Sequence, residues 1–207
     1  MTESVLIADD HPLFRQALTL AVREVLPDAR VIEAGTLAAA ARAVGEADAL
    51  RLILLDLKMP GATGYSGIAL LHAERPQIPI LVVSSSDAPE VAEEVRAFGA
   101  VGFLRKDSDL ATIEQTLEAA LRNEPLPDSS DEPVEEVRRE VASLTPTQLK
   151  VLLAVLEGKL NKQIAYELSV TEATVKAHMT AVMRKLDVRN RTQAALAAQA
   201  LGLGPAA

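Results

Sequence analysis

Five short apolar runs alternate with helical patterns over residues 1–123, and this alternation is the feature that most limits the fold. The runs cover residues 5–8, 30–34, 52–55, 80–83 and 102–104. Between them, apolar residues recur at the spacing of an amphipathic helix. Strands that alternate with helices favour a parallel sheet with right-handed crossovers and helices on both faces. The sequence therefore predicts a doubly wound α/β domain, a (βα)5 fold.

Polar side chains stand at or just after the ends of four of these runs. They are Asp9, Asp10, Asp56, Ser84 and Lys106. The carboxyl ends of parallel strands lie along one edge of a sheet, where open α/β sheets bind ligands. We expect these side chains to meet there, although an isolated Asp56 would equally suit an ordinary strand end that starts a turn.

The chemistry of this group is coherent. Three crowded carboxylates repel one another, and oxygen ligands with room for water suit Mg²⁺. A lysine and a serine hydroxyl beside them would supply a positive charge and a hydrogen bond to a phosphoryl group. A carboxylate that accepts such a group forms an acyl phosphate, and positioning with charge neutralisation catalyses the transfer. The residues therefore predict a magnesium-dependent phosphoryl acceptor.

These residues and their neighbours resemble the receiver domain of two-component response regulators. The resemblance is carried by Asp9-Asp10, Leu-Leu-Asp56 followed by Met59-Pro60-Gly61, Ser84, and Phe103-Leu104-Arg105-Lys106. It implies that a histidine kinase phosphorylates Asp56. It also implies that Mg²⁺ is held by Asp9, Asp10, Asp56 and the backbone carbonyl of Lys58. Ser84 and Phe103 would form a switch pair, in which the hydroxyl moves toward the phosphate and the ring turns inward. His11 is expected to be structural or solvated.

Composition excludes several other classes of site. The chain has no cysteine, which excludes disulfides, thiol catalysis and thiolate metal sites, and its three histidines are too scattered to suggest a zinc site. The N-terminus lacks the basic and apolar regions of a signal peptide. The absence of an apolar run of about 18 residues predicts no membrane span or membrane partner, and a cytoplasmic location.

Charge divides the chain into three parts. Residues 1–123 have a net charge of −7, residues 124–142 of −5, and residues 143–207 of +4. The middle part has little to bury and reads as an extended acidic linker, with a short charged helix over residues 134–142 as one further expectation. The basic end is the candidate for binding a polyanion.

Residues 143–207 predict a small domain of four helices. Thr145, Pro146 and Gln148 form a capping box that starts the first helix, and Asn161 and Thr171 are expected to cap the second and third. The fourth helix is expected over residues 191–200. Apolar residues of the third helix form one stripe, consisting of Val175, Met179, Val182 and Leu186. Two helices joined by a tight turn in a basic domain indicate a helix-turn-helix, although periodicity alone equally allows a helical bundle with solvated lysines.

The residues of this part resemble the LuxR-type DNA-binding domain. The match rests on Leu144-Thr145-Pro146, Glu157-Gly158, residues 161–165, Leu168, residues 171–178, Lys185-Leu186 and Asn190-Arg191-Thr192. A receiver followed by this domain is the architecture of the NarL/FixJ response regulators. The resemblance implies that the third helix faces bases in the major groove with Lys176, Ala177, Thr180 and Arg184. It implies that Lys162, Thr174, Lys185 and Arg191 approach phosphates and that the last helix forms the dimer surface.

We therefore predict a transcriptional regulator that binds double-stranded DNA as a homodimer under the control of phosphorylation at Asp56. RNA polymerase is a further candidate partner. We expect no enzyme activity beyond the receiver's own phosphorylation and dephosphorylation. One hypothesis is that the unmodified receiver and the acidic linker mask the basic domain until phosphorylation releases it.

Two alternatives stay open at this point. The first is a regulator that binds DNA without phosphorylation, because residues 61–67 form a longer segment than the turn usual after Met-Pro-Gly. The second is a phosphoryl-transfer enzyme with an accessory helical domain. Such an enzyme needs a base for turnover, and the sequence offers no candidate.

Overall fold

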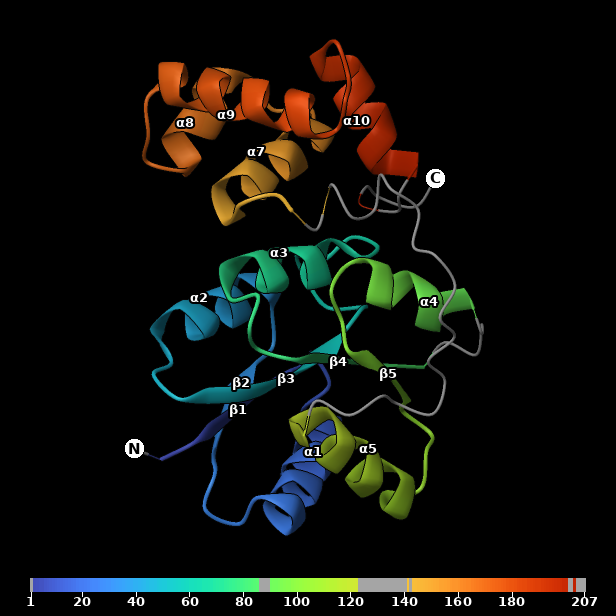
Figure 1. Ribbon diagram of the computed structural model, residues 1–207. Coiled ribbons are helices and arrows are strands. Elements are labelled where there is room, and N and C mark those ends of the chain that lie inside the picture. The colour runs from blue at the N-terminus through green and yellow to red at the C-terminus, as the bar shows by residue number, and fades with distance from the viewer. Residues whose placement is uncertain (1, 86–89, 123–140, 142, 201–202, 204–207) are drawn as a thin grey trace.

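The computed structural model describes residues 2–85, 90–122, 141, 143–200 and 203 (Figure 1).

The first domain is built on a five-stranded parallel sheet. The strands are β1 (Ser4–Ala8), β2 (Arg30–Ala34), β3 (Leu50–Asp56), β4 (Ile80–Ser84) and β5 (Gly102–Arg105), in the order β2-β1-β3-β4-β5. The register pairs Ala8 with Leu55, Asp56 with Val83, and Ser84 with Arg105. The carboxyl ends of the three central strands and of β5 therefore align at one edge, as the sequence predicts.

Helices cover both faces of this sheet (Figure 1). α1 (Pro12–Val25) and α5 (Leu110–Arg122) pack on one face, and α2 (Leu37–Glu46), α3 (Ser66–Glu74) and α4 (Glu90–Ala97) lie on the other. Successive residues of β3 alternate between the two cores, with Leu52 and Leu54 in the α1–α5 core and Ile53 and Leu55 in the opposite one. An apolar run without alternation is therefore what a strand buried on both faces requires.

Two helix ends of the first domain follow from single residues. Oδ1 of Asp109 accepts a hydrogen bond from the backbone N–H of Thr112 at 2.7 Å, which caps α5. Gly99 follows α4 with a φ of +100°, and a Cβ at this position would stand 2.5 Å from the ring of His72. Both the backbone conformation and the close ring exclude a larger residue there.

The turn between β3 and α3 is anchored by Tyr65. The Tyr65 ring stacks on Phe98 with centroids 5.4 Å apart, and its hydroxyl donates a hydrogen bond to Oε2 of Glu94 on α4. These two contacts connect the segment that follows Asp56 to α4 and to the residue just after it. The expected extra length of residues 61–67 stays a prediction.

The C-terminal domain contains α7 (Pro146–Leu156), α8 (Asn161–Glu167), α9 (Glu172–Lys185) and α10 (Arg191–Ala200). The capping box of α7 is confirmed, since Thr145 and Gln148 exchange hydrogen bonds of 3.3 and 3.1 Å. The stripe of α9 faces the domain core, and all four of its members are buried: Val175, Met179, Val182 and Leu186. Hydrophobic burial therefore orients the opposite side of α9 outward.

The predicted cap of α8 is wrong. Asn161 is the first helical residue, and Leu160 occupies the cap position, where its backbone N–H donates to Oε1 of Gln163 at 2.7 Å. The Asn161 side chain instead accepts a hydrogen bond from the guanidinium of Arg191 at 2.9 Å. The Asn161 side chain thus forms a tertiary contact with α10 instead of the local capping bond that the sequence pattern predicts.

The two domains touch through α3 and α7 (Figure 1). Nζ of Lys150 on α7 lies 2.6 Å from Oε1 of Glu74 on α3. The Thr63 hydroxyl donates a hydrogen bond of 3.0 Å to the carbonyl of Leu203, which is buried. Most of the predicted linker and its expected helix lie outside the described residues. Val141, at the end of that segment, is buried.

Among the described residues, no helix is both long and apolar enough to cross a membrane.

Candidate functional site

The edge formed by the strand ends gathers buried polar groups. Asp9 directly follows β1, Asp56 and Ser84 are the last residues of β3 and β4, and Lys106 directly follows β5. Asp9, Asp56 and Ser84 are 1%, 3% and 1% exposed. Buried carboxylates are costly unless they are paired and hydrogen-bonded, so the geometry of their partners decides what the site can do.

Lys106 is the shared partner of two of these carboxylates. Its Nζ lies 2.6 Å from Oδ2 of Asp9 and 2.9 Å from Oδ2 of Asp56. Burial alone would lower the pKa of Lys106, but the hydrogen bonds to Asp9 and Asp56 and their charges outweigh burial and raise this pKa above its ordinary value. The ammonium is therefore a permanent positive charge beside Asp56.

Both carboxylate oxygens of Asp56 have partners. The Oδ1 atom accepts a hydrogen bond of 3.2 Å from the backbone N–H of Lys58, and Oδ2 accepts one from Lys106. The backbone N–H of Lys106 in turn donates to the carbonyl of Ser84 at 2.9 Å, which joins the ends of β4 and β5. These contacts hold one carboxylate in a defined orientation next to a cation. Such an arrangement can present an oxygen nucleophile while neutralising the charge on an incoming anionic group.

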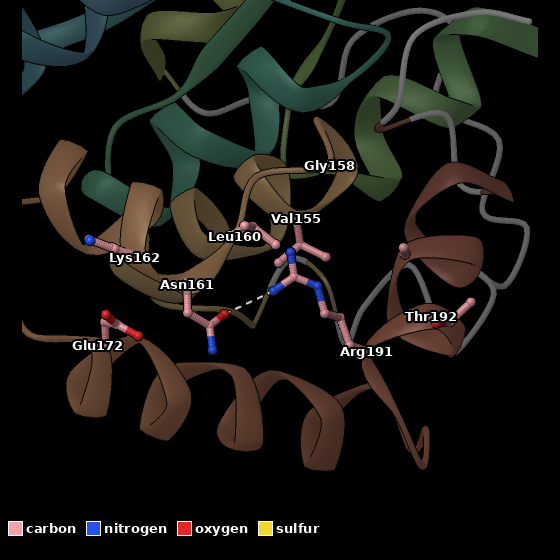
Figure 2. Close-up of a pocket in the computed structure, with 9 residues that line it drawn as sticks. Val155, Gly158, Leu160, Asn161, Lys162, Glu172, Arg191 and Thr192 are labelled. Atoms are coloured by element: carbon pink, nitrogen blue, oxygen red, sulfur yellow. Dashed lines mark hydrogen bonds between the residues drawn. The ribbon is translucent and has the colours of Figure 1, made fainter.

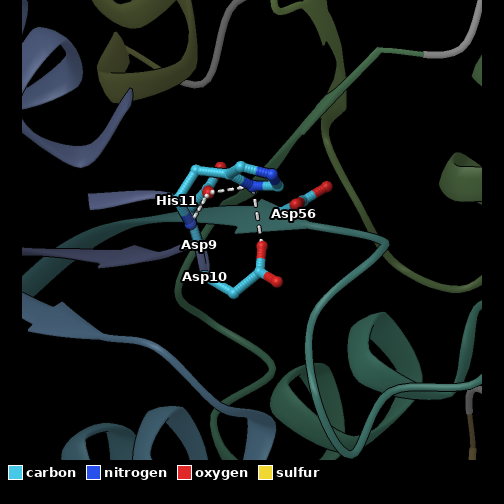
Figure 3. A group of neighbouring side chains, drawn as sticks. All are labelled: Asp9, Asp10, His11 and Asp56. Atoms are coloured by element: carbon cyan, nitrogen blue, oxygen red, sulfur yellow. Dashed lines mark hydrogen bonds and ion pairs between the residues drawn. The ribbon is translucent and has the colours of Figure 1, made fainter. Parts of the chain in front are cut away.

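Asp9, Asp10, His11 and Asp56 form an acidic cluster whose potential ligand atoms all lie within 4.8 Å of one another (Figure 3). Lys106 supplies one positive charge against three carboxylates, so the cluster stays negative. Carboxylate oxygens are the ligands that Mg²⁺ prefers. The donors present and their net charge therefore fit a hard divalent cation, and the carbonyl of Lys58 stays a predicted ligand.

Two residues of this site were not assigned to it from the sequence. Nδ1 of His11 lies 2.8 Å from Oδ1 of Asp10 and 3.3 Å from Oδ1 of Asp9, and the backbone N–H of His11 donates to Asp9 at 2.7 Å. The ring of Phe14 on α1 lies beneath Lys106, whose Nζ is 4.8 Å from the ring centroid. No short motif marks either contact, because each depends on how α1 leaves the sheet.

The predicted switch pair is only partly placed beside the cluster. Ser84 is buried at the sheet edge, whereas the neighbouring Ser85 is exposed. Phe103 is partly buried and packs against the apolar core on the α2–α4 side of the sheet. The roles of Ser84 and Phe103 stay predictions.

A cavity of about 640 Å³ opens next to the cluster, between the start of α1, the end of β4 and the start of α5. Its lining includes His11, Phe14 and Lys106. Leu13 and Leu110, which are 81% and 56% exposed, stand at its rim. Two exposed leucines therefore lie at the opening of a cavity that Lys106, the partner of the Asp56 carboxylate, also lines.

In the C-terminal domain, α9 presents the expected outward face. Lys176, Ala177, Thr180 and Arg184 are all exposed, on the side opposite the buried stripe. Lys162, at the start of α8, is exposed as well. The first domain contacts α7 and leaves this face of α9 open (Figure 1). The hypothesis that the receiver masks the DNA-binding face is therefore not what the structure shows, and most of the linker lies outside the described residues.

Two residues expected to approach phosphates already hold the domain together. The Arg191 guanidinium donates to Oδ1 of Asn161 at 2.9 Å (Figure 2). It also donates to the carbonyl of Lys159. Nζ of Lys185 donates to the carbonyl of Ser143 at 2.6 Å. The hydroxyl of Thr174, a third predicted phosphate contact, is paired with that of Thr171 at 2.8 Å. Within the described residues, the fourth, Lys162, is exposed and forms no ion pair.

Two family models match the chain. Residues 5–118 match the response regulator receiver domain, and residues 142–198 match the bacterial regulatory proteins of the luxR family. Both descriptions are of regulatory domains.

Similar proteins cover almost the whole chain. It is 40% identical to the glycerol metabolism activator of Pseudomonas putida over an alignment 207 positions long, with 94% of each protein covered. It is 35% identical to the transcriptional regulatory protein LiaR of Bacillus subtilis (strain 168), with 93% of this chain and 94% of LiaR covered. It is 34% identical to the nitrate/nitrite response regulator protein NarP of Escherichia coli (strain K12), with 93% and 92% covered.

Solved structures share the fold. The RcsB response regulator of Salmonella typhimurium matches with a TM-score of 0.55 at 22% identity, over 96% of this chain and 98% of that one. A structure of two RcsB dimers bound to two parallel DNAs matches with the same score, identity and coverage.

Proposed function

Because the chain belongs to the family of response regulators that join a receiver domain to a LuxR-type DNA-binding domain, we propose that phosphorylation of Asp56 by a histidine kinase controls its binding to specific DNA and hence transcription. One observation carries the proposal. The Asp56 carboxylate is fixed between the backbone N–H of Lys58 and the ammonium of Lys106 at the open edge of the sheet. We place the receiver at residues 1–123, the linker at 124–142 and the DNA-binding domain at 143–207.

The proposed transfer uses Asp56 as the nucleophile. A carboxylate oxygen attacks the phosphorus of a phosphohistidine, the P–N bond breaks with its electron pair returning to the imidazole, and an acyl phosphate forms. Lys106 neutralises charge on the phosphoryl oxygens, and the Ser84 hydroxyl would donate a hydrogen bond to one of them. Asp9, Asp10, Asp56 and the carbonyl of Lys58 would hold Mg²⁺, which supplies further charge neutralisation to the transferring group.

The donor would approach through the cavity beside Lys106. Leu13 and Leu110 form exposed apolar positions at its rim, so a kinase domain that carries the phosphohistidine can bury them while it reaches Asp56. Because the kinase domain would carry the phosphohistidine to Asp56, the chain itself would need no pocket for a small phosphoryl donor. We propose that it catalyses only its own phosphorylation and dephosphorylation.

The exposed face of α9 would enter the major groove, where Lys176, Ala177, Thr180 and Arg184 face base edges. Lys162 and Thr174 would approach phosphates. Lys185 and Arg191 would do so with part of their hydrogen-bonding capacity already used inside the domain. Two such domains, paired through α10, would bind as a homodimer to two half-sites, and RNA polymerase is the further candidate partner on that DNA.

The test compares wild type with Asp56→Asn, each with and without Mg²⁺ and the phosphoryl mimic beryllofluoride. Molar mass in solution and affinity for a duplex containing a candidate operator are measured in all four samples. We expect the mimic to shift wild type toward dimer and tighter DNA binding, and to leave Asp56→Asn unchanged. Identical mass and identical DNA affinity in all four samples would contradict control through Asp56.

A second candidate function is DNA binding that does not need phosphorylation. It is favoured by one observation, namely that the predicted DNA-binding face of α9 is already exposed beside the unmodified receiver. In that case Asp56→Asn would bind the operator as tightly as wild type treated with beryllofluoride.

A further inference from the structure

Lys106 has a third neighbour besides the two carboxylates, and this neighbour carries no charge. The Phe14 ring lies with its centroid 4.8 Å from Nζ of Lys106, while Asp9 and Asp56 approach the same ammonium to 2.6 and 2.9 Å. The Lys106 side chain is only 13% exposed. The ammonium is therefore enclosed by two negative oxygens and one aromatic face, each of which attracts a cation.

We propose that Phe14 is a positioning residue that keeps the ammonium of Lys106 at the phosphoryl-accepting edge. This inference rests on the proposed function of Asp56. The negative face of an aromatic ring attracts a nearby ammonium electrostatically, and the attraction grows when water is excluded. Phe14 thus acts on the transfer through Lys106, whose ammonium its ring faces.

The position of the ring explains why a lysine needs such support here. Lys106 and Phe14 both line the cavity of about 640 Å³, which gives the flexible lysine side chain space to leave the carboxylates. When the phosphoryl group is transferred, Asp56 becomes an acyl phosphate, and Lys106 loses part of its attraction to that carboxylate. The Phe14 ring stays, because it packs against the apolar core beneath α1 and α5. It therefore keeps the ammonium near the reacting group at the moment when its other partners change.

Phe14 comes from the third residue of α1, a helix that starts directly after the Asp9-Asp10-His11 turn. The same short segment therefore supplies the acidic ligands and the aromatic support of the lysine. A displaced point charge loses much of its effect on a transfer reaction, because catalysis of this kind depends on alignment.

The sharpest experiment changes the ring's electrostatics without changing its shape. Phe14 is replaced in the full-length protein by phenylalanines with increasing fluorination, ending with pentafluorophenylalanine, whose face no longer attracts cations. Phe14→Leu removes the ring, and Phe14→Tyr keeps an unfluorinated one. Ile113→Val is the matched control, because Ile113 lines the same cavity and belongs to the same core.

Two quantities are measured for each protein. The first is the rate of Asp56 phosphorylation by acetyl phosphate with Mg²⁺, together with its dependence on donor concentration. The second is the rate at which the Lys106 ammonium protons exchange with water, followed by NMR of the side chain at one fixed pH. This readout needs no phosphorylation, and a purely structural role of Phe14 would leave it unchanged.

We expect the maximal rate to fall stepwise with fluorination, by about 3- to 10-fold for pentafluorophenylalanine and for Phe14→Leu. The exchange rate of the Lys106 ammonium protons should rise in the same order, since a weaker ring contact leaves the ammonium more accessible to water. Phe14→Tyr and Ile113→Val should match wild type. Unchanged exchange and phosphorylation rates along the fluorinated series would overturn the proposal, as would equal losses in Ile113→Val.

Failure of the proposed function gives a different result. If Asp56 is not phosphorylated in wild type but the Lys106 ammonium protons still exchange faster with increasing fluorination, the positioning contact stands and the phosphoryl-accepting role does not. If wild type is phosphorylated and fluorination changes neither quantity, the function stands and the role of Phe14 is refuted.

Discussion

The two domains use their cations in opposite ways. Lys106 of the receiver is held against Asp9 and Asp56 and is largely hidden from water. Lys176 and Arg184 of the DNA-binding domain are exposed, and within the described residues neither forms an ion pair. A site that must stabilise a small reacting group needs a charge at one fixed point. A surface that meets a polyanion needs charges that remain available to it, so this contrast agrees with the two roles proposed for the two domains.

The largest expected effect is the loss of the buried cation. Lys106→Met leaves Asp9 and Asp56 without their positive partner, which should lower the free energy of unfolding by about 3 kcal/mol. Mg²⁺ should restore part of that loss, because the cation offsets the same carboxylates. Urea unfolding with and without Mg²⁺ measures both. Equal stability of wild type and variant without Mg²⁺ would show that the pair does not stabilise the receiver.

Loss of an exposed cation should weaken DNA binding and leave the free energy of unfolding almost unchanged. Lys176→Ala should weaken binding to a specific operator by about 1–3 kcal/mol, and Lys162→Ala should weaken all sequences evenly and reduce the salt slope by about one. Neither should change unfolding by more than about 0.5 kcal/mol. Fluorescence anisotropy over a salt series tests this. Lys159→Met is the control, since its ammonium already pairs with Glu157 and Glu167.

The contact between the domains is expected to contribute less. Lys150 and Glu74 are both partly exposed, so Lys150→Met should cost about 0.5 kcal/mol. Exchanging the two charges, with Glu74→Lys and Lys150→Glu together, should restore the wild-type value. Small-angle scattering and urea unfolding would report the domain arrangement and its stability. A double variant no better than Lys150→Met alone would argue against a direct pair.

The smallest expected effect depends on pH and involves His72. Its Nδ1 is buried and has no hydrogen-bond partner among the described residues. Burial lowers the pKa of His72 in the folded protein below its ordinary value of 6.5. As the pH falls, His72 therefore takes up a proton in the unfolded chain before it does so in the folded protein. The free energy of unfolding keeps its full value above pH 6.5 and decreases below it.

Unfolding of wild type and His72→Gln at about pH 7.5 and about pH 5.5 would measure this effect. Wild type should lose more stability than the variant between the two conditions, and His178→Gln serves as the control. The same pH dependence in all three proteins would exclude His72 as its cause.

The sequence predicted the parts of the molecule that depend on short patterns. The β3 run required a strand buried on both faces, and the strand–helix alternation required a parallel sheet that brings Asp9, Asp56 and Lys106 to one edge. The buried stripe of α9 likewise determined which side of that helix faces outward. These predictions succeeded because side-chain periodicity and the alternation of strands with helices can be recognised directly in the sequence.

The sequence failed where a side chain had a choice of partners. Asn161 is a good cap by composition, yet it accepts from Arg191, which lies 30 positions later. The receiver's part in the masking hypothesis depended on how two folded domains meet, and in the structure the receiver contacts α7. The part of the acidic linker stays a hypothesis, because most of the linker lies outside the described residues.

By itself, the sequence determined the family, the two folds, and the carboxylates and lysine that meet at the sheet edge. Only the tertiary structure decided that the Phe14 ring lies beneath the Lys106 ammonium, that Arg191 forms hydrogen bonds inside its domain, and that the outward face of α9 is exposed. The physical reason is that the first set follows from periodicity and from the shared edge of parallel strands. The second set follows from the directions in which whole elements leave the core, and no local pattern encodes those directions.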